Sequence, residues 1–192
     1  MSFMEADYEW FKFINSKVQQ YPLLDNIMIF FAEYVQYAFV LLILMLWLLN
    51  KSNFRVIAFQ AMFSFTLAYS INRIIELFIY RERPFISHEI IQLVEHSANS
   101  SFPSDHATSA IAIAVTLWLS SHHFKYTWFI LAIVVAFSRI WVGVHYPLDV
   151  VAGILNGVII ALFTHFLLFK VKPISLLIER PIFQGQGRMK DC

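Results

Sequence analysis

Ser138 to Asp149 places a serine, an arginine, a histidine and an aspartate between two long apolar runs. Ionisable groups this close to hydrocarbon are costly and mark functional sites. Pro147 favours the first position of a new helix, which puts His145 just before that helix and Asp149 in its first turn. From there the carboxylate can hold one imidazole nitrogen, which leaves the other free to act as a base or nucleophile. Arg139 adds a group suited to phosphate oxygens, so the stretch predicts phosphate chemistry.

A second polar cluster lies where an upstream apolar run begins. Ser104 or Asp105 is suited to cap a helix there, with His106 in the first turn. The amide groups and dipole of such a helix start attract an anion, and His106 is placed to protonate a leaving oxygen. Further upstream, Arg83 can bind two phosphate oxygens, as Arg139 can. These stretches together predict one anion-binding site.

Composition limits the class of protein. The chain has 192 residues, of which 59% are hydrophobic and 14% charged, whereas soluble domains are about a quarter charged. We therefore predict a single integral membrane domain. A net charge of +1 from scattered basic residues argues against nucleic acid as a partner. The single cysteine, Cys192, allows no internal disulfide, and the acidic N-terminus lacks the apolar core of a cleavable signal peptide.

The predicted fold is all-α: a polytopic membrane helix bundle of about five transmembrane helices plus an N-terminal interfacial helix within residues 1–22. The integral membrane domain is predicted to cover residues 1–172, and residues 173–192 to form a cytoplasmic tail. The predicted spans are residues 25–49, 54–80, 105–119, 126–142 and 147–169. Gly143 lets the chain bend between the last two.

Charged residues inside these spans carry further predictions. Glu33 interrupts the first span and lies near an interface or faces the bundle. In the second span, Arg73, Glu76 and, if the helix persists, Arg83 share one face. A simple salt bridge between Arg73 and Glu76 is as good an explanation as a role in the site. The small residues of span 105–119 predict a helix packed inside the bundle.

Alternating spans bring all three polar stretches to the same side of the membrane. Most basic residues outside them fall on the opposite side: Lys51, Arg55, Lys125, Lys170, Lys172, Arg180, Arg188 and Lys190. The positive-inside rule makes that side cytoplasmic. The predicted site is therefore extracytoplasmic, in a multi-pass membrane protein.

The three stretches together resemble the type 2 phosphatidic acid phosphatase superfamily, whose pattern is Lys-x6-Arg-Pro, then Pro-Ser-Gly-His, then Ser-Arg-x5-His-x3-Asp. The third motif is complete as Ser138-Arg139, His145 and Asp149. The second reads Pro103-Ser104-Asp105-His106, with aspartate in place of glycine. The first keeps Arg83-Pro84, but Glu76 stands where the pattern has lysine.

The resemblance implies a metal-independent reaction without cofactors, through a phosphohistidine. His145 would be the nucleophile, Asp149 its orienting partner and His106 the general acid. Arg83, Ser104 and Arg139 would bind the phosphoryl group. Arg81 or Arg73 could replace the missing lysine, and Asp105 either adds negative charge beside the substrate or caps its helix. Neighbouring arginines would repel a metal ion.

Within the superfamily, the small size and altered motifs resemble the bacterial bacitracin-resistance type of undecaprenyl-diphosphatase. This implies hydrolysis of a polyprenyl diphosphate lipid, undecaprenyl diphosphate, which recycles the carrier lipid of cell-wall peptidoglycan synthesis. One alternative is a phospholipid phosphatase acting on phosphatidylglycerophosphate or phosphatidic acid. Another is a non-catalytic protein that binds or transports an anionic lipid. The sequence leaves the oligomeric state open.

Overall fold

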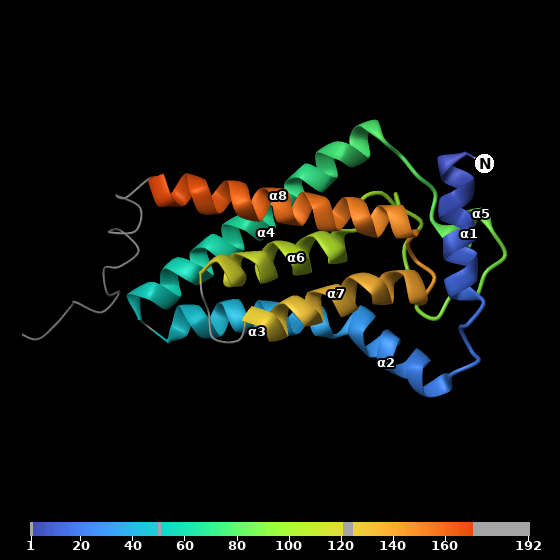
Figure 1. The fold of residues 1–192 in the computed structure, drawn as a ribbon, viewed down its shortest axis with the longest axis horizontal. Coiled ribbons are helices and arrows are strands. Elements are labelled where there is room, and N and C mark those ends of the chain that lie inside the picture. The colour runs from blue at the N-terminus through green and yellow to red at the C-terminus, as the bar shows by residue number, and fades with distance from the viewer. Residues whose placement is uncertain (1, 50, 121–124, 171–192) are drawn as a thin grey trace, which may run out of the picture.

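The computed structural model describes residues 2–49, 51–120 and 125–170, which form helices and no strand. The all-α prediction is confirmed. The helices are α1 (Phe3–Asn15), α2 (Pro22–Glu33), α3 (Val35–Leu48), α4 (Ser52–Phe78), α5 (Pro84–Ser87), α6 (Asp105–Leu119), α7 (Lys125–Trp141) and α8 (Pro147–Lys170). The long helices run side by side, and α1 crosses one end of the bundle (Figure 1). The predicted tail, residues 173–192, lies outside the described residues.

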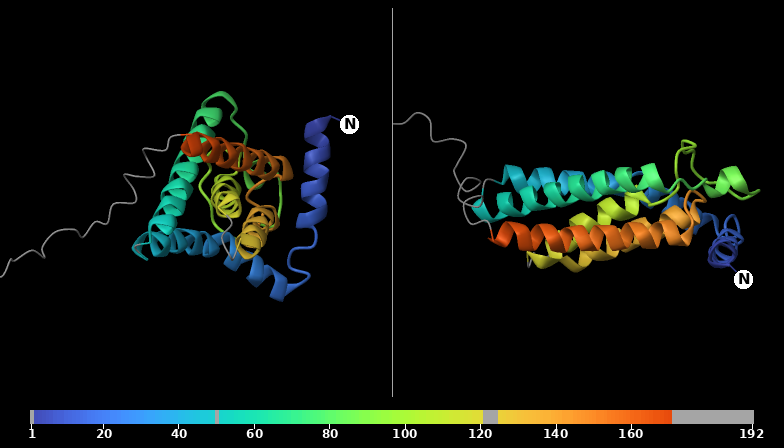
Figure 2. Two further views of the ribbon diagram at one scale, coloured as in Figure 1. Left: turned by 60° about the vertical axis from the view of Figure 1, so that its left-hand side comes forward. Right: turned by 90° about the horizontal axis from the view of Figure 1, so that it is seen from above.

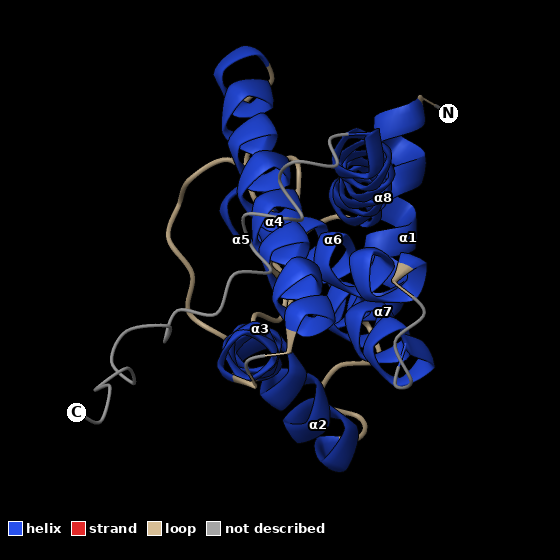
Figure 3. Ribbon diagram, turned by 90° about the vertical axis from the view of Figure 1, so that its left-hand side faces the viewer, coloured by secondary structure: helices blue, strands red, loops and turns tan. Residues whose placement is uncertain are grey.

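Helix α6 lies at the centre of the bundle, enclosed by α3, α4, α7 and α8 (Figures 2 and 3). Its alanines are buried, as the small-residue pattern predicted. Small side chains let neighbouring backbones approach closely. At Gly153 of α8, an added Cβ would lie 2.6 Å from the carbonyl oxygen of Ser104, just before α6. The backbone N–H of Ser104 also donates to the carbonyl of Asp149, at 3.0 Å. The starts of α6 and α8, each carrying a motif, are therefore fixed against each other.

The first predicted span is not one straight helix. It consists of α2 and α3, which meet at a bend of 42° around Tyr34. Glu33 lies at the end of α2, beside this bend, and lines a cavity together with His106 and Arg139. The bend has a consequence for the site, because carbonyl groups in the last turn of a helix lack intrahelical donors. The carbonyl of Ala32 accepts a hydrogen bond from Arg139 instead.

The second predicted span, residues 54–80, is present as α4, and the helix does not persist to Arg83. Helix α4 ends at Phe78, and the chain runs extended through Ile79 to Arg83 before the short helix α5. Pro84 occupies the first turn of α5, where its missing N–H is tolerated. Arg83 is thereby separated from the face of α4 that carries Arg73, and it enters the site from a loop.

Two helices are long and apolar enough to cross a membrane, α4 and α8, and the bent pair α2 and α3 makes a third candidate. Helix α6 is apolar but shorter. The described residues thus contain two or three candidate spans by length and composition. The count of five transmembrane helices stays a prediction.

The corner between α7 and α8 depends on a glycine. Gly143 has a φ of +85°, and a Cβ there would lie 2.7 Å from the carbonyl oxygen of Ile91, so a side chain is excluded. The turn folds the chain back on itself, and the N–H of His145 donates to the carbonyl of Arg139 at 3.2 Å. Two residues of the third motif are therefore brought together by backbone geometry.

Helix α1 packs its apolar stripe onto this corner. Phe11 is fully buried, and its ring lies 5.5 Å from that of Tyr146. Val18, beyond the end of the helix, is also buried. Phe3, Trp10 and Phe13 remain exposed. The predicted N-terminal helix is therefore present, and it covers the end of the bundle where the three motifs meet.

Candidate active site

His145 is enclosed at the corner between α7 and α8, with 2% of its surface exposed. Its Nδ1 lies 2.8 Å from the carbonyl oxygen of Ser101. A carbonyl can only accept a hydrogen bond, so this contact assigns the proton to Nδ1. The lone pair is then on Nε2, 3.2 Å from a terminal nitrogen of Arg83. The predicted nucleophile thus points at a cation that can bind a phosphoryl group.

Asp149 does not hydrogen-bond the ring of His145 directly. Its Oδ2 lies 3.8 Å from Nδ1 of His145, too far for a hydrogen bond, because the Ser101 carbonyl occupies that position. The same oxygen accepts from the hydroxyl of Ser101 and, at 2.8 Å, from the N–H of Tyr146. The predicted direct hydrogen bond is therefore wrong. At 3.8 Å the carboxylate can still stabilise positive charge on the imidazole.

Arg83 is buried, and each of its three guanidinium nitrogens donates a hydrogen bond. Its Nε and Nη2 donate to the side chain of Asn99, at 3.0 and 2.9 Å, and Nη1 donates to the carbonyl of Val144 at 2.9 Å. Burial lowers the pKa of Arg83 to about 10, which leaves the group charged at neutral pH. The guanidinium is therefore a fixed cation beside Nε2 of His145.

Two further predicted phosphate ligands carry buried polar atoms with no hydrogen-bond partner among the described residues. These atoms are Nε of Arg139 and Oγ of Ser104. An unsatisfied buried polar group costs about 1–3 kcal/mol, so such groups are rare in proteins. Ser104 is the N-cap of α6, yet its side chain makes no capping hydrogen bond. Both atoms are thus available to the oxygens of a bound anion.

His106 lies in the wall between two cavities. One, of about 290 Å³, is also lined by Arg139, Glu33 and His96. The other, of about 230 Å³, runs among apolar residues of α3, α4 and α6. This arrangement suits a substrate with a charged head and an apolar tail.

The two residues that depart from the family motifs, Glu76 and Asp105, are joined by one arginine. Arg73 contacts the carboxylates of Glu76, at 2.6 Å, and of Asp105. Asn72 donates to the other oxygen of Asp105 at 2.9 Å. The predicted salt bridge between Arg73 and Glu76 is confirmed, and Asp105 does not cap α6. Its charge is balanced by Arg73 beside the site.

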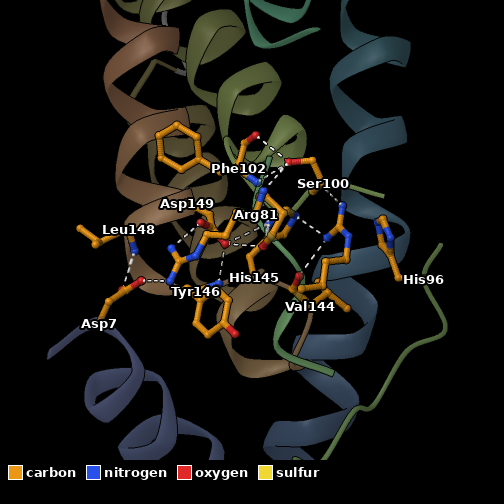
Figure 4. Close-up of polar contacts among 12 residues, drawn as sticks. Asp7, Arg81, His96, Ser100, Phe102, Val144, His145, Tyr146, Leu148 and Asp149 are labelled. Atoms are coloured by element: carbon orange, nitrogen blue, oxygen red, sulfur yellow. Dashed lines mark hydrogen bonds and ion pairs between the residues drawn. The ribbon is translucent and has the colours of Figure 1, made fainter. Parts of the chain in front are cut away.

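Arg81 lies between Asp7 and Asp149 (Figure 4). One terminal nitrogen is 2.8 Å from Oδ1 of Asp149, and the other is 2.6 Å from Oδ2 of Asp7. The guanidinium also lies over the ring of Tyr146, at 3.8 Å from its centre. Its charge is thus directed at two carboxylates, a placement that spacing alone did not indicate.

Sequence reasoning missed Ser101, Asn99, His96 and Asp7. The first three lie in the long loop that leads to α6, within eight residues of the second motif, but no spacing rule distinguished them. Their proximity to the motif was the only signal. Asp7 is far from every motif in the sequence, and its polar neighbours in the helix gave no sign of burial.

His96 and His145 are expected to stay neutral at pH values where an ordinary histidine becomes protonated. Burial and the nearby Arg83 lower the pKa of His96 to about 4 and hold the pKa of His145 well below 6.5. In ¹⁵N-histidine NMR of the protein in detergent micelles, neither side chain should titrate between pH 7.5 and 5.5. Glutamine variants of each assign the signals. A His145 midpoint at or above 6.5 would contradict this environment.

Comparison with known proteins identifies the family of the chain. The sequence model of the family described as "PAP2 superfamily" matches residues 57–173. "Undecaprenyl-diphosphatase BcrC" of Bacillus subtilis (strain 168) is 35% identical, over 85% of this chain and 83% of that protein. "Bacitracin transport permease protein BcrC" of Bacillus licheniformis is 37% identical, over 85% and 81%. The crystal structure of a transmembrane PAP2-type phosphatidylglycerolphosphate phosphatase from Bacillus subtilis superposes with a TM-score of 0.68 at 21% identity, covering 88% of this chain and 87% of that one.

Proposed function

The chain belongs to the PAP2 superfamily, whose members include metal-independent lipid phosphatases, and we propose that it is an undecaprenyl-diphosphate phosphatase. The protein removes the terminal phosphate of undecaprenyl diphosphate at the outer leaflet of the bacterial plasma membrane. This reaction recycles the cell-wall carrier lipid and would confer bacitracin resistance. The similarity to a Bacillus subtilis undecaprenyl-diphosphatase over most of both chains supports the choice of substrate.

One observation carries the catalytic proposal: the Nδ1 proton of His145 is held by a carbonyl, and its Nε2 lone pair faces Arg83. In the first step Nε2 attacks the terminal phosphorus, and the bridging P–O bond breaks. Undecaprenyl phosphate leaves with the bonding electron pair, and the phosphoryl group stays on His145. Arg83 and Arg139 neutralise charge on the equatorial oxygens, and the Ser104 hydroxyl donates a hydrogen bond to one of them, as positioned donors do in phosphoryl transfer.

The second step is hydrolysis of the phosphohistidine. His106 accepts a proton from a water molecule as the water oxygen attacks phosphorus. The P–N bond breaks, its electron pair returns to Nε2, and inorganic phosphate is released. Positive charge on the phosphorylated imidazole is stabilised by the nearby Asp149.

The proposed membrane placement follows from charge. Five spans, built from the bent pair α2 and α3 with α4, α6, α7 and α8, put the site on the side with fewer basic residues. The positive-inside rule makes that side extracytoplasmic. The lipid tail then lies in the bilayer beside the apolar cavity at His106, and the headgroup enters between the arginines.

A phospholipid phosphatase is the second candidate, because the same fold occurs in a phosphatidylglycerolphosphate phosphatase. That reaction would use the same residues on a monophosphate. The two substrates differ in their leaving group, which is a phosphate ester in one and an alcohol in the other.

Side-by-side turnover tests the proposal. Purified full-length protein in detergent with EDTA should release phosphate from undecaprenyl diphosphate with a kcat/KM at least about tenfold above that for phosphatidylglycerophosphate or phosphatidic acid. His145→Gln, purified identically, controls for contaminating phosphatases. A preference for either phospholipid would favour the second candidate. Lipid binding without phosphate release would favour a binding or transport protein.

A further inference from the structure

Helix α1 carries three acidic residues in one stretch, and only one of them is buried. Asp7 is 4% exposed, whereas Glu5 and Glu9 face outward. Burial of a carboxylate is costly unless its oxygens are fully hydrogen-bonded. The burial of Asp7 against the end of the bundle therefore reflects specific partners.

Both oxygens of Asp7 contact the elements that hold the reacting histidine. Oδ1 accepts from the backbone N–H of Leu148 at 2.9 Å, and Oδ2 pairs with Arg81 at 2.6 Å (Figure 4). Leu148 lies in the first turn of α8, where amide groups lack intrahelical acceptors and negative charge is favoured by the dipole. Asp7 thus completes the N-terminus of α8 from another helix, one residue before Asp149.

Arg81 joins the two carboxylates through separate nitrogens. Its planar fork can bind Asp7 and Asp149 at the same time, which a point charge could not do with the same geometry. Without Asp7, the whole positive charge of Arg81 would be directed at Asp149. The field at His145 would become more positive, and the Asp149 side chain would lose one fixed neighbour.

We propose that Asp7 is a positioning residue for the His145–Asp149 pair, acting through Arg81 and the first turn of α8. Helix α1 is then part of the active site, although none of its residues belongs to a family motif. The inference rests on the proposed phosphatase function. The polar contacts of Asp7 are with Arg81 and Leu148. Replacement of Asp7 should therefore slow the chemical step rather than weaken substrate binding.

The test uses the isosteric change Asp7→Asn in the full-length protein, with Glu9→Gln on the exposed face of α1 as the matched control. Asp7→Asn should lower kcat by about tenfold or more, as loss of an outer orienting residue does elsewhere. KM should change by less than about twofold, because ground-state binding is untouched. Asp7→Glu, which keeps the charge, should recover part of the loss.

A double-mutant cycle separates positioning from a merely structural role. If Asp7 acts through Asp149, then Asp7→Asn should have little further effect on kcat in an Asp149→Asn background. Equal losses in both backgrounds, or a rise in KM with unchanged kcat, would overturn the proposal. A lowered melting temperature with unchanged kcat would do the same.

A spectroscopic readout keeps this inference distinct from the proposed function. Asp7→Asn should shift the ¹⁵N signals of the His145 ring, and Glu9→Gln should not. If wild-type protein hydrolyses none of the three lipids, the proposed function fails, while this shift still supports the link between Asp7 and His145. Unchanged His145 signals would contradict the link whatever the activity.

Discussion

His145→Gln is expected to lower kcat on undecaprenyl diphosphate by at least about 10⁴-fold, because loss of a covalent nucleophile removes the reaction path itself. Glutamine can keep a hydrogen bond to the Ser101 carbonyl, so the fold around the corner should survive. Initial rates of phosphate release in EDTA, at saturating substrate, measure the effect.

The matched control is His88→Gln. His88 stacks on Tyr8 of α1, with ring centres 3.9 Å apart, and it is not one of the proposed phosphate-binding residues. Its replacement should change kcat by less than about threefold, as is usual away from special sites. A His145→Gln enzyme that retains a tenth or more of wild-type activity would exclude His145 as the nucleophile.

His106→Gln is expected to trap the phosphorylated enzyme. With undecaprenyl diphosphate the leaving group is a phosphate ester, a stable anion whose second pKa is about 6, so its departure needs little help from an acid. The second step does need a base to activate water. Rapid-quench experiments should therefore show a near-stoichiometric burst of undecaprenyl phosphate, followed by turnover about 10²–10⁴-fold slower than wild type.

Monophosphate lipids provide the contrast. An alkoxide leaving group requires the acid in the first step, so His106→Gln should abolish the burst on phosphatidic acid. Loss of the burst on both substrates would show that His106 acts before the phosphohistidine forms, or that it only shapes the cavity.

The starts of two helices could be predicted because they depend on residues that are neighbours in the sequence. The start of α6 at Asp105 and of α8 at Pro147 follow from capping and proline preferences, and both agree with the structure. The sharp turn at Gly143 was predicted on the same basis. The convergence of the three motifs at one end of the bundle required only that the helices alternate in direction.

The remaining features depend on contacts between distant parts of the chain. No proline or glycine marks the bend at Tyr34 in the sequence. The carbonyl of Ala32, next to this bend, accepts a hydrogen bond from Arg139 on α7. His145 donates its Nδ1 hydrogen bond to the backbone carbonyl of Ser101, and a backbone acceptor leaves no trace in the sequence. In the sequence, Asp7 cannot be distinguished from an acidic residue on an exposed helix face. Its burial depends on the contact with Leu148 of α8, which is distant in the sequence.

The most direct test of the mechanism is to identify the covalent intermediate. Wild-type enzyme would be mixed in EDTA with undecaprenyl diphosphate labelled at the terminal phosphate, and quenched in alkali within one turnover. The account predicts protein-bound label that is stable to alkali, labile to acid and mapped by peptide mass spectrometry to His145. Label on another residue, or phosphate release in a single turnover with no protein-bound label, would contradict it.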